Sequence, residues 1–266
     1  SAMRSLILLV AVCSFHAAAA FQLPSRLGLR ARRAPRQDIC MVSRRPFIAG
    51  NWKMNPETME EAAKLAAGVV EGSKGSKAQV AIFVPHAYLY QVGEATRGSE
   101  VELGAQSIYY EDKGAFTGAV SVSMVKSMGC KHVLCGHSER RTIFKNSDEE
   151  VNRKVKKVLA EGLDPLLCIG ESKTEYLGKL NKAICATQLS KGLAGVAKED
   201  MKRVTIAYEP VWAIGTGLTC DPETAQEVHA FVRSWLAELY DEDTARRVRI
   251  LYGGAVTPES VDELMR

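Results

Sequence analysis

Seven short apolar runs, each followed by a longer stretch with helical character, constrain the fold of this chain more than any other feature. The runs begin roughly 20 to 45 residues apart, which is the spacing of a strand–helix unit. They lie at residues 47–50, 80–85, 101–106, 132–136, 165–170, 204–209 and 248–253. Their almost continuous apolar character is typical of strands that are covered on both faces of a parallel sheet. The series therefore predicts an α/β fold, either a doubly wound sheet or a (β/α)8 barrel.

Capping residues mark the expected starts of several helices. Asn55-Pro56-Glu57, Asp221-Pro222-Glu223 and Thr257-Pro258-Glu259 each place a capping side chain before a proline at the first helical position. Ser147 and Glu150 have the spacing of a capping box. These signals support the alternation of strands and helices.

Polar residues follow several different strands, and this favours the barrel. They are Asn51 and Lys53, Gln106, His137, Glu171, Glu209, and Gly253-Gly254. In a (β/α)8 barrel the carboxyl ends of all strands meet on one face, where these enzymes build their sites. No G-x-G-x-x-G follows the first run, which weakens the dinucleotide-binding alternative. The pattern is one strand short of eight, because Arg266 falls within the seventh helix.

The first 45 residues differ from the rest of the chain. They carry eight arginines and one acid, Asp38, a net charge of +7 within a total of +4. Residues 3–20 have the basic start, apolar run and small residues of a signal peptide, and residues 21–45 resemble a transit peptide. We therefore expect a leader at 1–45 and a folded domain at 46–266. A two-part leader of this kind indicates a complex plastid, and a secreted or mitochondrial location is the alternative.

The remaining 221 residues have a net charge of −3, with no block of like charge. Nucleic acid and anionic membranes are therefore poor candidate partners, and no segment after the leader is long enough to span a bilayer. The seven cysteines include no C-x-x-C pair, so the sequence predicts neither a disulfide framework nor a zinc site. Cys135 and Cys168 lie in apolar runs, and we expect both to be buried.

Three segments carry residues suited to chemistry. Lys53 offers a positive charge above the barrel for an anionic substrate, or it is an exposed lysine near a helix start. His137 ends an apolar strand, where a neutral imidazole can donate a hydrogen bond to a substrate oxygen or cap a helix. Arg140 and Arg141, just after it, are expected to form structural ion pairs.

The third segment, residues 207–217, places Glu209 at the end of a strand as a candidate base. A Pro/Trp start and a glycine-rich finish predict a stiff lid, with backbone N–H groups near Gly215 that can hold phosphate. The alternative is a surface loop with a capping residue.

Taken together, these segments resemble the triosephosphate isomerase family. The shared motifs occur in the family's order between about Arg45 and Arg266. They are Asn51-x-Lys53, Gly136-His137-Ser138-Glu139-Arg140-Arg141, Ala207-Tyr208-Glu209-Pro210-Val211-Trp212-Ala213-Ile214-Gly215-Thr216-Gly217 and Tyr252-Gly253-Gly254.

The resemblance implies an isomerase that interconverts dihydroxyacetone phosphate and glyceraldehyde 3-phosphate, as in glycolysis, gluconeogenesis or the Calvin cycle. It makes Glu209 the base, His137 the neutral proton donor and Lys53 the stabilising charge. Asn51 would bind substrate beside Lys53, and Glu139 would either support these residues without touching the substrate or relay protons. No metal or organic cofactor is implied.

The resemblance also implies a phosphate site and a dimer. Gly215, Gly253, Gly254 and Ala255 would meet the phosphate, under a lid from Pro210 to about Cys220. The tip Phe116-Thr117-Gly118 would insert into a second copy of the chain.

The chain departs from the family pattern at several positions. Ala255 replaces the usual Ser, and the missing hydroxyl would cost lid closure about 1 kcal/mol. Ala119 replaces a Glu and Ser107 an Asn near the expected dimer interface, while Leu218 and Cys220 change the second hinge of the lid.

The resemblance further implies that strand eight and its helix are missing, which would leave two open edges. A non-catalytic truncated barrel is therefore the alternative function, and another phosphosugar isomerase is a second one that the lid sequence disfavours.

Overall fold

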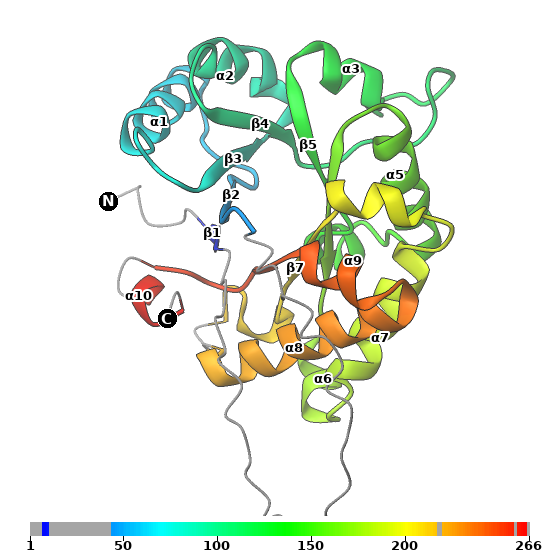
Figure 1. Ribbon diagram of the computed structural model, residues 1–266. Coiled ribbons are helices and arrows are strands. Elements are labelled where there is room, and N and C mark those ends of the chain that lie inside the picture. The colour runs from blue at the N-terminus through cyan, green and yellow to red at the C-terminus, as the bar shows by residue number, and fades with distance from the viewer. Residues whose placement is uncertain (1–6, 11–43, 217–219, 258–259, 265–266) are drawn as a thin grey trace, which may run out of the picture.

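The computed structural model describes residues 7–10, 44–216, 220–257 and 260–264. Seven parallel strands stand side by side, and each pairs with the next along the chain, with helices outside (Figure 1). They are β2 Phe47–Asn51, β3 Gln79–Val84, β4 Val101–Ala105, β5 Cys130–Cys135, β6 Asp164–Ile169, β7 Thr205–Tyr208 and β8 Arg249–Tyr252. The predicted barrel is confirmed.

Most of the helices lie in the connections between the strands, and the last one follows β8. The α-helices are α1 Met59–Gly72, α2 Leu89–Thr96, α3 Val122–Ser127, α4 Ser138–Thr142, α5 Asp148–Ala160, α6 Lys173–Leu177, α7 Asn181–Gly192, α8 Pro222–Leu239, α9 Glu242–Arg247 and α10 Val261–Leu264. Three short 3-10 helices are η1 His86–Tyr88, η2 Lys198–Arg203 and η3 Val211–Ala213.

The capping predictions have different outcomes. Asp221 caps α8, because its carboxylate accepts a hydrogen bond from Thr224 N at 2.6 Å. Ser147 caps α5 through Glu150 N at 3.2 Å, but the Glu150 carboxylate lies 2.9 Å from Lys154 Nζ. The reciprocal half of the predicted box is therefore replaced by an ion pair.

The predicted helix start at Asn55-Pro56-Glu57 is wrong. The Asn55 amide donates to Trp52 O at 3.3 Å and so folds back toward the end of β2. The helix begins later, at Met59, where the Thr58 hydroxyl accepts from Glu61 N at 3.2 Å. At the third predicted start, the Thr257 hydroxyl accepts from Ser260 N at 3.3 Å, while residues 258–259 lie outside the described residues.

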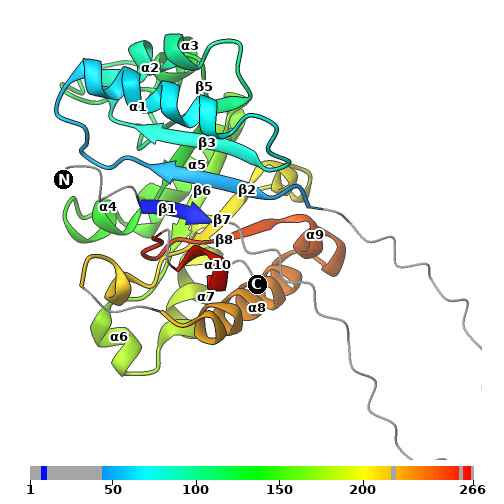
Figure 2. The ribbon, with the colours of Figure 1, turned by 90° about the vertical axis from the view of Figure 1, so that its left-hand side faces the viewer.

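A short strand from the beginning of the chain, β1 (Ile7–Val10), lies between β8 and β2 (Figure 2). It runs antiparallel to both, with Leu8 opposite Gly50 and Val10 opposite Tyr252. The expected open edges are therefore closed in this structure. Edge strands present unpaired N–H and C=O groups, and an extended apolar segment satisfies them by adding to the sheet. The assignment of residues 3–20 as a signal peptide stays a prediction.

Two apolar cores lie on the two faces of the barrel wall. The inner core fills the barrel with layers of side chains, namely Phe47, Ala49, Ala81, Phe83, Leu134, Leu166, Cys168, Ala207 and Leu251. The outer core lies between strands and helices and takes the alternate residues, such as Ile82 and Val84. Cys135 and Cys168 are both fully buried, as predicted.

A polar cluster closes the amino-terminal end of the barrel. Glu102 on β4 accepts hydrogen bonds from His132 Nε2 at 2.7 Å and from the Gln79 amide, and Lys131 Nζ lies 3.3 Å from its other oxygen. Burial alone would raise the pKa of the Glu102 carboxyl, but hydrogen bonds from His132 and Gln79 and the charge of Lys131 bring the pKa down to about 2. The cluster therefore stabilises the fold most when Glu102 is ionised.

We expect Glu102→Gln to lower the free energy of unfolding at pH 7 by about 1–2 kcal/mol, since one charge-assisted hydrogen bond is lost in a partly exposed cluster. The folded-state pKa of about 2 lies below the unfolded value of 4.5. The contribution is therefore complete above pH 4.5 and is lost as the pH falls toward 2. Urea unfolding between pH 7 and pH 3 at fixed protein concentration measures it.

Glu100→Gln is the matched control, because Glu100 lies on the same side of the molecule but is 87% exposed, 3.8 Å from Arg45. This variant should unfold like the parent chain. If Glu102→Gln and Glu100→Gln change the pH dependence of the free energy of unfolding equally, the interpretation of the cluster is wrong.

Candidate active site

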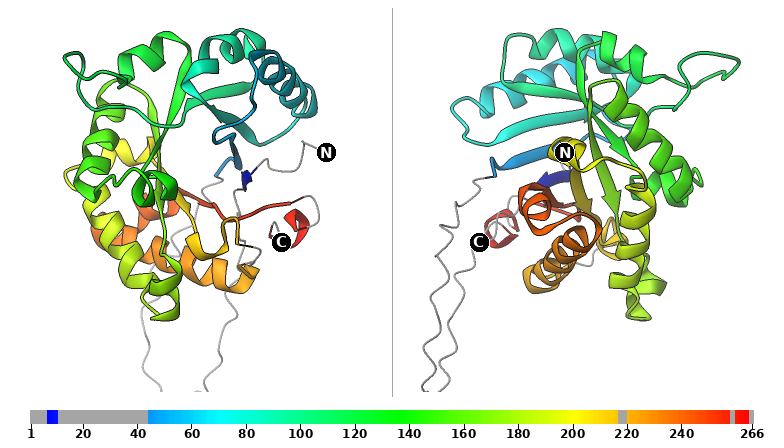
Figure 3. Two further views of the ribbon diagram at one scale, coloured as in Figure 1. Left: turned by 180° about the vertical axis from the view of Figure 1, so that it is seen from behind. Right: turned by 45° about the vertical axis from the view of Figure 1, so that its right-hand side comes forward.

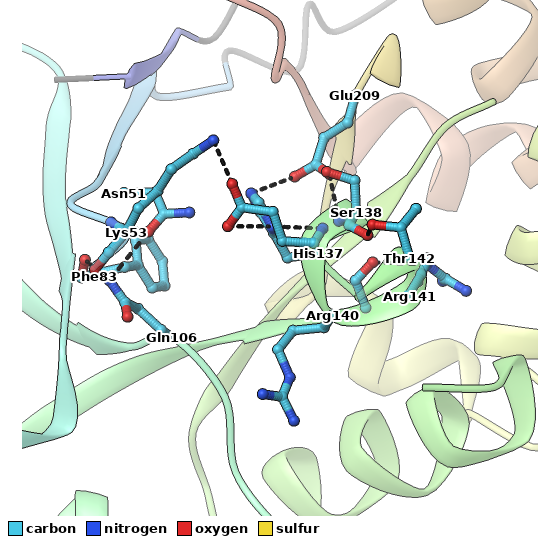
Figure 4. Close-up of polar contacts among 12 residues, drawn as sticks. Asn51, Lys53, Phe83, Gln106, His137, Ser138, Arg140, Arg141, Thr142 and Glu209 are labelled. Atoms are coloured by element: carbon cyan, nitrogen blue, oxygen red, sulfur yellow. Dashed lines mark hydrogen bonds and ion pairs between the residues drawn. The ribbon is translucent and has the colours of Figure 1, made fainter. Parts of the chain in front are cut away.

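The carboxyl ends of four strands bring the predicted site residues together (Figure 4). Asn51 ends β2 and Lys53 follows it, Gln106 follows β4, His137 follows β5, and Glu209 follows β7. This is the face on which a (β/α)8 barrel holds its chemistry.

The backbone at Lys53 is held in an unusual conformation. Its φ angle is 52°, a left-handed value that costs a residue with a side chain roughly 1 kcal/mol or more. Asn51 Oδ1 accepts from Lys53 N at 2.9 Å, and Gln106 Nε2 donates to Lys53 O at 2.7 Å. The sequence identifies Gln106 only as a polar residue at a strand end, and the structure shows that it supports this turn.

The Lys53 ammonium forms an ion pair with Glu139. Its Nζ lies 2.6 Å from Glu139 Oε1, and Oε2 of the same carboxylate lies 3.7 Å from His137 Nδ1. Glu139 therefore connects the lysine on one strand end with the histidine on another.

The position of His137 determines which ring nitrogen carries the proton. Glu139 N donates to His137 Nδ1 at 3.2 Å, so a neutral ring carries its proton on Nε2. That Nε2 lies 3.4 Å from Glu209 Oε1, and the His137 side chain is 8% exposed. The ring therefore caps α4 with one nitrogen and points the other toward Glu209, and its role as a donor to a substrate oxygen stays a prediction.

Glu209 is 1% exposed, and each of its two oxygens has its own environment. Oε2 accepts from Ser138 N at 2.8 Å, while Oε1, which faces His137, accepts no hydrogen bond within the described part of the chain. The backbone is fixed by Glu209 N donating to Ile169 O at 2.7 Å. A Cβ atom at Gly170 would lie 1.8 Å from Glu209 O, so only glycine fits beneath it.

The start of the predicted lid is tied to a second buried carboxylate, Glu171. Trp212 Nε1 donates to Glu171 Oε1 at 2.7 Å, and Tyr208 OH donates to the same oxygen at 3.0 Å. Burial raises the pKa of Glu171, and these hydrogen bonds oppose the rise. Tyr176 stacks on Trp212 at 4.1 Å between ring centroids. Residues 217–219 of the lid lie outside the described residues.

Of the four residues predicted to bind phosphate, Gly253 differs from the other three. Gly215 is exposed with a φ of 69°, and Gly254 must be glycine, because a Cβ there would lie 2.1 Å from Tyr252 Oη. Ala255 is partly exposed beside it. Gly253 differs from expectation, since its N–H donates to Tyr208 O at 2.6 Å. Its amide extends the β7–β8 ladder and is not available to phosphate in this arrangement.

Arg140 and Arg141 have structural contacts. Arg141 Nη1 lies 2.6 Å from Asp148 Oδ1, the predicted kind of ion pair. Arg140 forms no ion pair within the described residues. Its guanidinium stacks over the Phe144 ring at 4.1 Å and points away from His137 and Glu209 (Figure 4).

Within the described ranges, no group of three or more His, Cys, Asp or Glu side chains could hold a metal ion. In the same part of the chain, every helix is too short or too polar to cross a membrane.

Comparison with known proteins adds independent evidence. A family model described as Triosephosphate isomerase matches residues 46–266. A protein of Carboxydothermus hydrogenoformans named triosephosphate isomerase is 47% identical over 223 residues, covering 84% of this chain and 88% of the relative. One of Chlorobium phaeovibrioides with the same name is 48% identical over 83% of this chain and 88% of its own. A third protein with this name, from Caldanaerobacter subterraneus, is 45% identical and covers 84% of this chain and 89% of the relative.

Proposed function

Because the chain belongs to the triosephosphate isomerase family, we propose that it interconverts dihydroxyacetone phosphate and glyceraldehyde 3-phosphate through an enediolate. The isomerase interpretation of the sequence is confirmed at the level of family and enzyme class. The observation that carries the mechanism is the pairing of a buried carboxylate, Glu209, with an imidazole nitrogen, Nε2 of His137, at 3.4 Å.

Glu209 is the base. Its carboxylate removes a proton from the carbon beside the substrate carbonyl, and the electron pair of that C–H bond forms the C=C bond of the enediolate. A proton then passes from the base to the neighbouring carbon, so the base is regenerated and no electrons leave the substrate.

His137 and Lys53 stabilise the charge that develops on oxygen. The Nε2–H of His137 donates to the substrate oxygen and passes a proton between the two oxygens of the enediolate. Lys53 supplies a fixed positive charge, and Asn51 and Gln106 hold its backbone in place. In the free enzyme the Lys53 ammonium is occupied by Glu139, so substrate binding weakens or replaces that ion pair.

Glu209 has to leave Ser138 before it acts. In the free enzyme, Glu209 Oε2 accepts a hydrogen bond from Ser138 N at the amino terminus of α4. We place this bond as the resting position of the base. Lid closure over the bound phosphate would move the carboxylate toward the substrate and exclude water.

The remaining predictions belong to the same proposal. Gly215, Gly254 and Ala255 present backbone N–H groups to the phosphate, and two copies of the chain associate through Phe116-Thr117-Gly118. Residues 1–45 act as a two-part leader that directs the domain at 46–266 to a plastid, where the enzyme would serve the Calvin cycle or glycolysis.

The proposal is tested by running the reaction in D2O. A base that holds the abstracted proton in an enediolate mechanism exchanges part of it with solvent, so the aldehyde product should carry deuterium on its second carbon by NMR. Glu209→Gln is the control, because it keeps an oxygen for Ser138 N but cannot accept the proton. Rapid product formation without any deuterium would exclude the enediolate, and the absence of turnover would favour the non-catalytic alternative.

A further inference from the structure

The loop of residues 110–119, between β4 and α3, projects well away from the barrel (Figure 3). Its base is closed by Tyr109 N donating to Val120 O at 2.8 Å, and its tip turns through Ala119 N donating to Phe116 O at 2.9 Å. At the tip, Phe116 remains 41% exposed. The loop therefore presents an aromatic side chain to the outside on a hydrogen-bonded frame.

Aromatic packing inside the loop determines where Phe116 lies. Its ring lies 4.8 Å from the Tyr109 ring, and Tyr109 lies 4.4 Å from the Tyr110 ring. Gly114 makes this possible, with a φ of 148° and no side chain, because a Cβ there would lie 2.8 Å from the Phe116 ring. The exposed aromatic is thus held by the loop itself.

Two cations of α5 hold the same loop from the barrel side. Lys157 Nζ lies 2.5 Å from Asp112 Oδ1 and 3.0 Å from Glu161 Oε1, and the Lys157 side chain is mostly buried. One turn earlier, the Arg153 guanidinium lies 5.3 Å from the centre of the Tyr110 ring. Glu161 fixes the ammonium on the helix, and Asp112 and Tyr110 attach the loop to it.

We propose that Lys157 and Arg153 form a clamp that prepares the loop 110–119 for association with a second copy of this chain. The inference rests on the homodimer of the proposed function. It adds Lys157 and Arg153, which lie outside the tip Phe116-Thr117-Gly118, to the residues that support the dimer. A loop that already has its bound shape loses less conformational freedom on association, so the clamp strengthens the dimer without touching the partner. Both contacts are charged or cation–π in nature, so added salt should weaken the dimer partly through them.

The test is the dimer dissociation constant measured by sedimentation equilibrium. Lys157→Met and Asp112→Asn should each raise the constant about fivefold, as expected for an ion pair worth up to about 1 kcal/mol. The double variant should be no weaker than Lys157→Met alone, because both changes remove one contact. Lys156→Met, on the exposed side of α5, is the matched control and should leave the constant unchanged.

A second measurement reports on the loop itself. Trypsin cleaves after Lys113, which is exposed within the loop, and cleavage should be faster in Asp112→Asn than in the parent chain when both are diluted to monomers. Asp112→Asn leaves the Lys157–Glu161 pair in place, so it separates loop release from damage to α5.

The possible results separate the two claims. A parent chain that stays monomeric at every concentration overturns the homodimer and the clamp with it. A parent dimer whose constant and cleavage rate do not change in Asp112→Asn overturns the clamp alone.

Discussion

Glu209→Gln should lower kcat by about 10²–10⁴-fold, or roughly 3–5 kcal/mol of activation free energy, while the fold stays intact. The amide cannot remove a proton from carbon. Its oxygen can still accept from Ser138 N, which holds the carboxylate at 2.8 Å in the parent chain. Because the substituted side chain has nearly the same shape, KM should change far less than kcat. Coupled assays in both directions measure the two constants.

Glu171→Gln is an informative comparison, because Glu171 is the other buried carboxylate at a strand end and touches the lid rather than the catalytic histidine. It should change lid behaviour and leave proton abstraction possible, so its loss of kcat should be much smaller. If Glu209→Gln retained the parent rate, or if Glu171→Gln were the more damaging change, Glu209 would not be the base.

The barrel and most of the site could be predicted from the sequence because both depend on short local patterns. A strand that is buried on both faces must be apolar along its length, and the polar residue that ends it must then lie at the barrel mouth. His137 and Glu209 follow this rule, since each comes directly after an apolar run and they meet at 3.4 Å.

Contacts between distant segments were not predictable in the same way. The bonds from Gln106 to Lys53 O and from Ser138 N to Glu209 join residues 53 and 71 positions apart, and no local pattern marks them. The environment of the Gly253 amide was not predictable for a related reason. A glycine after a strand marks a turn, but whether its N–H is free depends on the neighbouring strand, and here Tyr208 O accepts it.

The closed edge of the barrel is a further case. The apolar residues Ile7–Val10 had the composition of a signal peptide, and the same composition suits a strand. Their pairing with β2 depends on the free hydrogen-bonding groups of β2 and β8, which lie far along the chain. The sequence of residues 7–10 alone does not distinguish a signal peptide from a strand.

His137→Asn should lower kcat by about 10²–10³-fold and leave α4 in place. The Asn side-chain oxygen can occupy the place of Nδ1 and accept from Glu139 N, which donates to the ring at 3.2 Å in the parent chain. Nothing in Asn reaches the place of Nε2, so the hydrogen bond to the developing oxyanion is lost. The measurement is kcat, with far-UV circular dichroism and thermal unfolding to follow the fold.

His137→Ala separates the two roles of the ring, because it removes the cap of α4 as well as the donor. Loss of a capping side chain costs about 1 kcal/mol, so this variant should unfold at a lower temperature than His137→Asn. Its kcat should nevertheless be similar, since both variants lack Nε2–H. If His137→Asn kept the parent kcat while His137→Ala lost it, the ring would act only through α4. The proton donor would then be Lys53. Its ammonium lies beside Glu139, as His137 does, and carries protons to donate.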